Sequence, residues 1–175
     1  NLFKYRADDL IAYGADGIAQ NMHNQRGHGM ELDINYTATN KLSLRGNFAW
    51  QKSKDQDTAE PVADAPGYQA SLALRLRATH SCTLNTQANW VAGRKRVSGD
   101  TNRATMKDYT TVDLTVRCDH IAGKPLEIAA SIRNAFNADI REPSPYNPML
   151  GRAGVVGDYP QEGRSFYIEA SYKFK

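Results

Sequence analysis

A hydrophobic period of two runs through most of the chain, and it limits the folds that the chain can adopt. In residues 30–38, Met30, Leu32 and Ile34 alternate with charged or polar residues. Successive side chains of a strand point to opposite faces of a sheet, so this alternation predicts strands with one apolar and one polar face. No helix of useful length is expected. Eight strands are expected, near residues 2–12, 30–38, 42–51, 68–77, 84–90, 112–119, 126–133 and 165–174.

The connections between these segments alternate between short and long. All seven prolines lie in the connections, as expected for a residue that cannot donate to a sheet ladder. The opening connection, near residues 13–20, belongs by its order to the long-loop end. All short turns are therefore expected at one end of the sheet. The short connections are 39–41, 79–81 and 119–125, and the long ones are 52–66, 93–108 and 137–163.

The apolar face of these strands indicates a transmembrane β-barrel. Short turns at one end and long loops at the other are typical of such barrels. Within the expected strands the apolar face carries no charge, and the mean hydropathy of −0.61 suits a barrel or a soluble protein rather than a helical membrane protein. A soluble β-sheet protein with its apolar side inward is the alternative. Aromatic residues lie toward the strand ends in the manner of interfacial girdles, at Tyr36, Trp50, Tyr68, Trp90, Phe166, Tyr172 and Phe174.

Charge and histidine spacing argue against two other kinds of site. The net charge of +3 comes from basic residues scattered along the chain, which gives little basis for a nucleic-acid partner. His23 and His28 are five residues apart and thus fall on opposite faces of a strand, so no metal site is expected there.

Motifs along the whole chain resemble those of TonB-dependent outer-membrane receptors. "NAFNADIREP" (134–143) is similar to the step that begins their last extracellular loop, and "YPQEGRSFYIEASYKF" (159–174) to their closing strand. The chain departs from these patterns at Ala135, Asn137, Ile140, Glu162 and Lys175. Upstream, "NLFKYRADDLIAY", "NQRGHGMELDINY", "DAPGYQASLALRLR", "VAGRKR" and "YTTVDLTVRC" are similar to further receptor motifs in the same order.

The resemblance implies a barrel of about 22 strands closed around an N-terminal plug. Residues 1–175 would then be the C-terminal part of the barrel, with the plug and earlier strands outside the chain. It implies no enzyme and no covalently bound cofactor. The implied function is import of a ferric siderophore or similar scarce nutrient across a Gram-negative outer membrane, energised through the TonB complex. A self-contained eight-stranded structural or adhesion barrel and a soluble ligand carrier are the alternatives.

The same resemblance suggests which residues carry function. Arg94, Lys95 and Arg96, at the foot of a long loop, can attract an anionic ferric chelate, with solvated loop charge as the alternative. The alternating stripe of the closing strand is implied to be the signal for the outer-membrane assembly machinery, through Phe166, Ile168, Ala170, Tyr172 and Phe174. The candidate ligand-binding residues are Arg94, Arg96, Arg133, Arg141, Tyr146, Arg152 and Tyr159.

The two cysteines fall at the same end of the sheet. Cys82 begins one expected strand and Cys118 ends the next, and alternation places both on the apolar face. Antiparallel pairing can set them side by side, which allows a cross-strand disulfide; two reduced lipid-facing thiols are the alternative. A Cα separation above about 7 Å would exclude the bridge.

Overall fold

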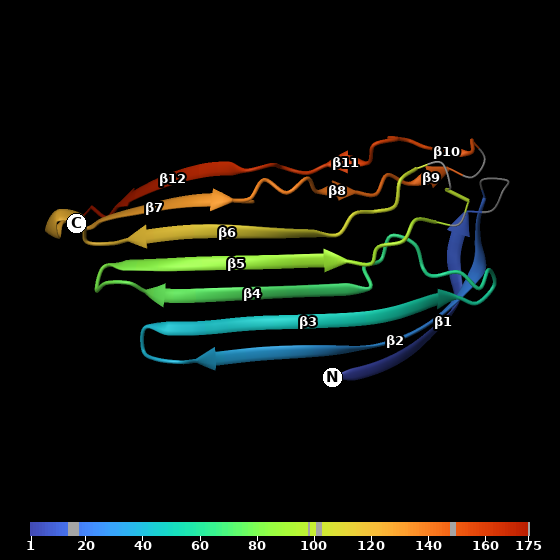
Figure 1. The fold of residues 1–175 in the computed structure, drawn as a ribbon, viewed down its shortest axis with the longest axis horizontal. Helices are drawn as coiled ribbons and strands as arrows, with labels where there is room; N and C mark the ends of the chain where they lie inside the picture. Colours follow the sequence, from blue (N-terminus) through green and yellow to red (C-terminus); the bar gives the residue numbers. More distant parts are fainter. Residues whose placement is uncertain (14–17, 98, 101–102, 148–149, 175) are drawn as a thin grey trace.

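The protein forms one large antiparallel β-sheet. The computed structural model describes residues 1–13, 18–97, 99–100, 103–147 and 150–174. Eight strands lie in the order β1-β2-β3-β4-β5-β6-β7-β12 (Figure 1), which confirms the predicted all-β architecture. The sheet is open, with β1 and β12 at its edges. The strands are β1 (Leu2–Tyr13), β2 (Ala19–Thr37), β3 (Leu42–Asp55), β4 (Tyr68–Arg77), β5 (Cys82–Ala92), β6 (Tyr109–Cys118), β7 (Leu126–Arg133) and β12 (Ser165–Tyr172).

The short turns lie at one end of the sheet and the long connections at the other, as expected (Figure 1). The β6–β7 turn contains the 3₁₀ helix η1 (Ile121–Gly123). No helix in the described ranges is long and apolar enough to cross a membrane. The long connection after β7 contains four two-residue strands, β8 (Arg141–Glu142), β9 (Tyr146–Asn147), β10 (Arg152–Ala153) and β11 (Tyr159–Pro160).

Strand β2 begins at Ala19, well before the expected residue 30, and two glycines explain the difference. A Cβ atom at Gly27 would overlap the Tyr5 ring, and one at Gly29 would overlap the Trp50 carbonyl and crowd the Phe3 ring. The rings of β1 therefore cover positions of β2 that have no side chain, and the sequence loses its alternation there. Residues 14–17 of the opening connection lie outside the described ranges.

Apolar side chains form a continuous band across one face of the sheet. In the strand register Leu44 pairs with Leu74, and Leu84 pairs with both Leu76 and Val116. The band is uncovered, since Ile168, for example, is 83% exposed. Among the described residues, the buried apolar ones are Ala92, Met106, Ala129 and Ala153. Four small or flexible side chains are no core for a sheet of this size, so the band requires an apolar environment outside the chain.

The opposite face is polar. Ser71 pairs with Asn47 and Asn89, and Asn89 pairs with Thr111. Hydroxyl side chains bond across neighbouring strands, as between Thr115 Oγ1 and Ser131 Oγ at 2.9 Å. This face suits water, and the sheet thus has the two-sided character of a barrel wall with a hydrated interior.

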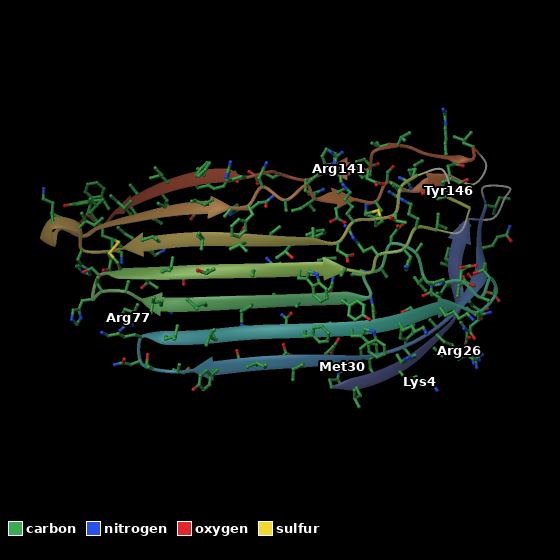
Figure 2. The ribbon with its side chains drawn as sticks, viewed as in Figure 1. Lys4, Arg26, Met30, Arg77, Arg141 and Tyr146 are labelled. Carbon is green, nitrogen blue, oxygen red and sulfur yellow. A yellow bond between two sulfur atoms is a disulfide. The ribbon has the colours of Figure 1, made fainter. Side chains whose placement is uncertain are left out.

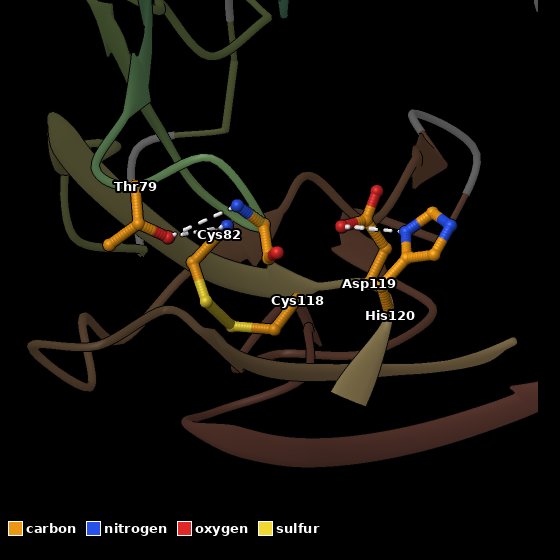
Figure 3. Close-up of a disulfide and its surroundings, with 6 residues drawn as sticks. Thr79, Cys82, Cys118, Asp119 and His120 are labelled. Atoms are coloured by element: carbon orange, nitrogen blue, oxygen red, sulfur yellow. Dashed lines mark hydrogen bonds and ion pairs between the residues drawn. A yellow bond between two sulfur atoms is a disulfide. The ribbon is translucent and has the colours of Figure 1, made fainter. Parts of the chain in front are cut away.

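A disulfide joins β5 to β6 at the short-turn end. Cys82 and Cys118 are register partners with Cα atoms 4.2 Å apart and sulfur atoms 2.17 Å apart (Figure 3). The adjoining turn is held by Thr79, whose Oγ1 accepts hydrogen bonds from the backbone amides of Ser81 (3.2 Å) and Cys82 (2.9 Å). The side-by-side placement that the alternation allowed is the one in the structure.

Candidate functional site

The long connections fold together at their end of the sheet. Strand β8 pairs with β11, and β9 pairs with β10, so the connection after β7 has its own local structure (Figure 1). The backbone amide of Asp64, between β3 and β4, donates to the carbonyl of Lys95 at 2.7 Å. Arg96 and Asp158 in turn join the β5–β6 connection to the connection after β7. Residues from three long connections are therefore close in space, and loops positioned by a rigid scaffold often carry binding residues.

A buried group of charged residues joins two of these connections. We call Arg96, Asp100, Arg103, Ser144 and Asp158 the loop cluster. Asp158 accepts two hydrogen bonds from Arg96 (3.1 and 2.6 Å) and one from Arg103 (2.7 Å). Arg103 also pairs with Asp100, with Nε 2.7 Å from Oδ2. The Asp158 side chain is only 7% exposed, so these are charge-assisted bonds in a largely dry setting.

Ser144 completes the loop cluster through its backbone. It is 1% exposed, and its amide donates to Asp158 Oδ1 at 3.1 Å. Its carbonyl accepts from Arg103 at 3.0 Å, and its Oγ accepts from the Val155 amide at 2.9 Å. The connection between β5 and β6 and the connection between β7 and β12 are thus held in one arrangement.

These hydrogen bonds shift the pKa values of two members of the loop cluster. The hydrogen bonds from Arg96 lower the pKa of the Asp158 carboxyl, although burial opposes the shift. The hydrogen bond to Asp100 raises the pKa of Arg103. A carboxyl whose pKa is lowered by folding contributes stability above its unfolded pKa and loses it as pH falls through the folded pKa. The loop cluster is therefore expected to be acid-sensitive.

A cavity of about 410 Å³ lies beside the loop cluster. Its volume is within the range of small-molecule sites. Five cations and two carboxylates line it, so the local charge favours an anion. The charged lining residues are Arg94, Arg96, Arg103, Lys107, Arg141, Asp139 and Asp158.

Three of the predicted ligand-binding residues line this cavity, and their guanidinium groups already have protein partners. Arg94 is 4% exposed and donates to the carbonyls of Arg141 (2.9 Å) and Lys107 (3.0 Å). Arg96 is paired with Asp158 in the loop cluster. Arg141 donates to Asp139 at 2.9 Å and to the Gly157 carbonyl at 3.2 Å. Arg94 and Arg96 thus hold the loops in place and set the charge of the cavity.

The other four predicted residues lie elsewhere. Tyr146 is half-buried in β9, and Arg152 is exposed in β10, across that small ladder. Tyr159 is exposed in β11. Arg133 lies at the end of β7 with its guanidinium 4.9 Å from the Tyr167 ring centre. Figure 2 shows Arg141 and Tyr146 at the long-loop end, as expected for residues of these connections.

Sequence reasoning did not single out Asp100, Arg103, Ser144 or Asp158. The spacing of Asp100 and Arg103, three residues apart, was a local signal for one ion pair. Nothing local indicates that Asp158 meets Arg96, which is 62 residues away. In the described part of the chain, no group of three or more His, Cys, Asp or Glu side chains is placed to hold a metal ion, and the His23 side chain lies outside it.

The stripe of the closing strand is on the open edge of the sheet. Phe166, Ile168 and Tyr172 are exposed on β12, and Phe166 pairs with Ile132 of β7. Strand β12 ends at Tyr172, two residues before the expected end, and the Phe174 ring packs on Tyr172 with centres 4.9 Å apart. Phe166, Ile168, Ala170 and Tyr172 alternate along β12 and so share one face, and their role in assembly stays a prediction.

Solved structures that share this fold include uptake and import receptors. The ferric yersiniabactin uptake receptor FyuA from Yersinia pestis aligns with a TM-score of 0.78 at 17% identity, over 97% of this chain and 26% of the receptor. The outer-membrane ferripyoverdine receptor of Pseudomonas aeruginosa aligns with a TM-score of 0.73 at 16% identity, over 97% and 24%. The ferric-catecholate import receptor Fiu from E. coli K12 has a TM-score of 0.71 at 17% identity, over 97% and 24%.

The sequence comparison identifies the family. No curated protein matches the chain in sequence. The chain spans about a quarter of the length of the solved receptors that it resembles. The family model described as TonB dependent receptor-like, β-barrel matches residues 1–135, which is more than half of the chain. The chain therefore belongs to the TonB-dependent receptor-like β-barrel family.

Proposed function

We propose that residues 1–175 are the C-terminal part of an outer-membrane receptor that imports a ferric siderophore or a similar scarce nutrient with energy supplied through TonB. The family match carries the proposal. The remainder of the barrel and the plug would be supplied by the rest of the receptor, because the sheet described above is open at β1 and β12. The transported ferric chelate would be the ligand of the import step, and no covalent chemistry is proposed.

The cavity beside the loop cluster supports an anionic ligand. Lys107 lines it, is exposed, and is not paired with a carboxylate in the described residues. The hydrogen bond that Arg94 donates to Lys107 goes to the backbone carbonyl of Lys107 and not to its side chain. The ammonium group of Lys107 is therefore available to a ligand that enters the cavity, whereas Arg94 and Arg96 act through the loops that they hold.

Lys107→Gln in the full-length receptor tests the ligand site. Hydrogen bonds to charged groups contribute about 1.5–3 kcal/mol, so we expect the chelate concentration for half-maximal uptake to rise at least tenfold, to roughly a hundredfold. The measurement is uptake of radiolabelled iron, presented with candidate chelates, by cells whose own receptor gene is deleted. Lys124→Gln, in the short β6–β7 turn, is the matched control and should leave uptake unchanged.

Two outcomes would contradict the proposal. Uptake that continues without TonB would remove the energised mechanism, and absence of uptake for every ferric chelate would remove the iron ligand.

A self-contained eight-stranded barrel is less well supported, because β1 and β12 do not pair with each other in the described sheet. A soluble carrier is opposed by the uncovered apolar band, exemplified by Ile168.

A further inference from the structure

Six basic side chains gather on the outer face of the sheet at its first edge. In the strand register Lys4, His28 and Lys52 form one cross-strand row. The next row toward the long loops contains Arg6, Arg26 and Lys54. All six residues are exposed. We call Lys4, Arg6, Arg26, His28, Lys52 and Lys54 the basic patch.

The basic patch lies on the same face as the apolar band, so the expectation that this face carries no charge is wrong at Lys4 and Arg6 of the first strand. Lys52 is two residues from Trp50, and His28 is two residues from Met30, so each pair shares a face. The His28 and Trp50 rings make an edge contact with centres 5.6 Å apart. Tyr5, between the two rows, points the other way and bonds Ser53 through its hydroxyl at 2.9 Å. The patch is therefore on the outside of the barrel wall.

The basic patch lies just beyond an aromatic row. Trp50 pairs with Tyr68 in the register, and the Tyr68 and Trp90 rings are 6.0 Å apart. Aromatic belts mark the level of the lipid headgroups. The two basic rows follow two and four residues beyond Trp50, roughly 7 and 14 Å along a strand. Strand tilt of about 45° reduces these distances to roughly 5 and 10 Å above the belt.

The charge of the basic patch is largely uncompensated by the protein. Asp8 pairs with Arg6 at 2.8 Å. Within the described ranges, Lys4, Arg26, Lys52 and Lys54 have no carboxylate partner. In Figure 2, Lys4 and Arg26 lie on the long-loop side of Met30, near the edge of the sheet. Cations at headgroup level on a lipid-facing wall fit the phosphate groups of lipids.

We propose that the basic patch binds the phosphate groups of phosphorylated lipids in the leaflet on the long-loop side. The inference uses the membrane orientation of the proposed function and adds a lipid ligand to it. The two rows offer phosphate contacts from three strands, β1, β2 and β3, so a lipid with two phosphates would be held better than a lipid with one.

The test is lipid binding by the full-length receptor in neutral detergent. Bisphosphorylated lipid A is titrated, and bound lipid is counted by native mass spectrometry. Each basic residue near an anionic surface contributes about fivefold, so Lys4→Gln, Lys52→Gln and Lys54→Gln together should weaken binding roughly a hundredfold. Unchanged lipid A binding by this triple variant would overturn the proposal.

The matched control removes the same charge at the other end of the sheet. Lys41, Arg77 and Lys124 lie at the short-turn end of the sheet, where Figure 2 labels Arg77. Replacing these three residues by glutamine should leave the lipid A affinity as in the unaltered receptor. An equal loss of affinity would show a net-charge effect and overturn the proposal. Lipid A with one phosphate should bind more weakly than lipid A with two. Inorganic phosphate that displaces lipid A at equal concentration would indicate a free-anion site instead.

Chelate uptake by the basic-patch variant separates this proposal from the transport function, because uptake should persist.

Discussion

Replacing Asp158 by asparagine is expected to release the long loops from one another. Removing one partner from a buried charged group costs about 3–5 kcal/mol, because the remaining charge has no counter-ion. Here Arg96 and Arg103 would both lose the carboxylate that they share, which leaves the single carboxylate of Asp100 for two buried guanidinium groups. Asparagine has the same shape and tolerates the positive φ of 63° at this position, so the substitution tests charge rather than backbone strain. Hydrogen exchange of residues 134–164 in the full-length receptor should therefore become much faster.

Asp139→Asn is the matched control. Asp139 also pairs with an arginine, Arg141, but its side chain is 64% exposed, and exposed pairs contribute about 0–1 kcal/mol. Lowering the pH should reproduce the Asp158→Asn effect in the unaltered receptor, since protection is lost as pH falls below the unfolded pKa, near 3.8, and through the lowered folded pKa of Asp158. Equal exchange in the two variants would show that the loop cluster does not hold the loops.

Removing the disulfide is expected to give the second largest effect. Cys82 and Cys118 are 36 residues apart in sequence, and closing a loop of this size stabilises a protein by about 2–4 kcal/mol. The double substitution Cys82→Ala and Cys118→Ala should lower the urea concentration at the unfolding midpoint of the receptor in detergent. Alanine is used because both positions are on the apolar face, where serine would add a separate polar cost.

Reduction with a thiol reagent gives an independent measurement of what the disulfide contributes to the stability of the receptor. The reduced receptor and the double-alanine variant should unfold at similar urea concentrations, and each single-alanine variant should match them. An unchanged midpoint in the double variant would mean that strand pairing of β5 and β6 alone determines stability at this end of the sheet.

The strands could be predicted because their periodicity is local. The alternation in residues 42–51 is visible without any neighbour, and β3 occupies this segment. The start of β2 could not be predicted, because Gly27 and Gly29 have no side chains and interrupt the alternation. The Tyr5 and Phe3 rings of β1 lie over these two positions. The two-residue strands β8 to β11 are too short to show a period. Their pairing depends on how residues 134–164 fold back on themselves.

The sequence predicted some of the residues that form the candidate site, but it did not predict which residues they contact. Arg94 and Arg96 stood out as loop cations, but their partners come from a connection tens of residues away. Whether an arginine faces a ligand or a carboxylate is decided by that long-range packing. The disulfide is the intermediate case: the faces and ends of Cys82 and Cys118 followed from alternation, whereas their pairing required the register between β5 and β6.

The apolar face of this sheet is expected to contact lipid and the polar face to contact water. Spin labels at Leu72→Cys and Ser71→Cys, neighbours on β4, test it in the full-length receptor in a bilayer. Leu72 is 51% exposed on the apolar band, so its label should be accessible to oxygen dissolved in the lipid and shielded from a water-soluble nickel complex. The label at Ser71 should show the opposite preference. Equal accessibility of both labels to the nickel complex would contradict this assignment of the two faces.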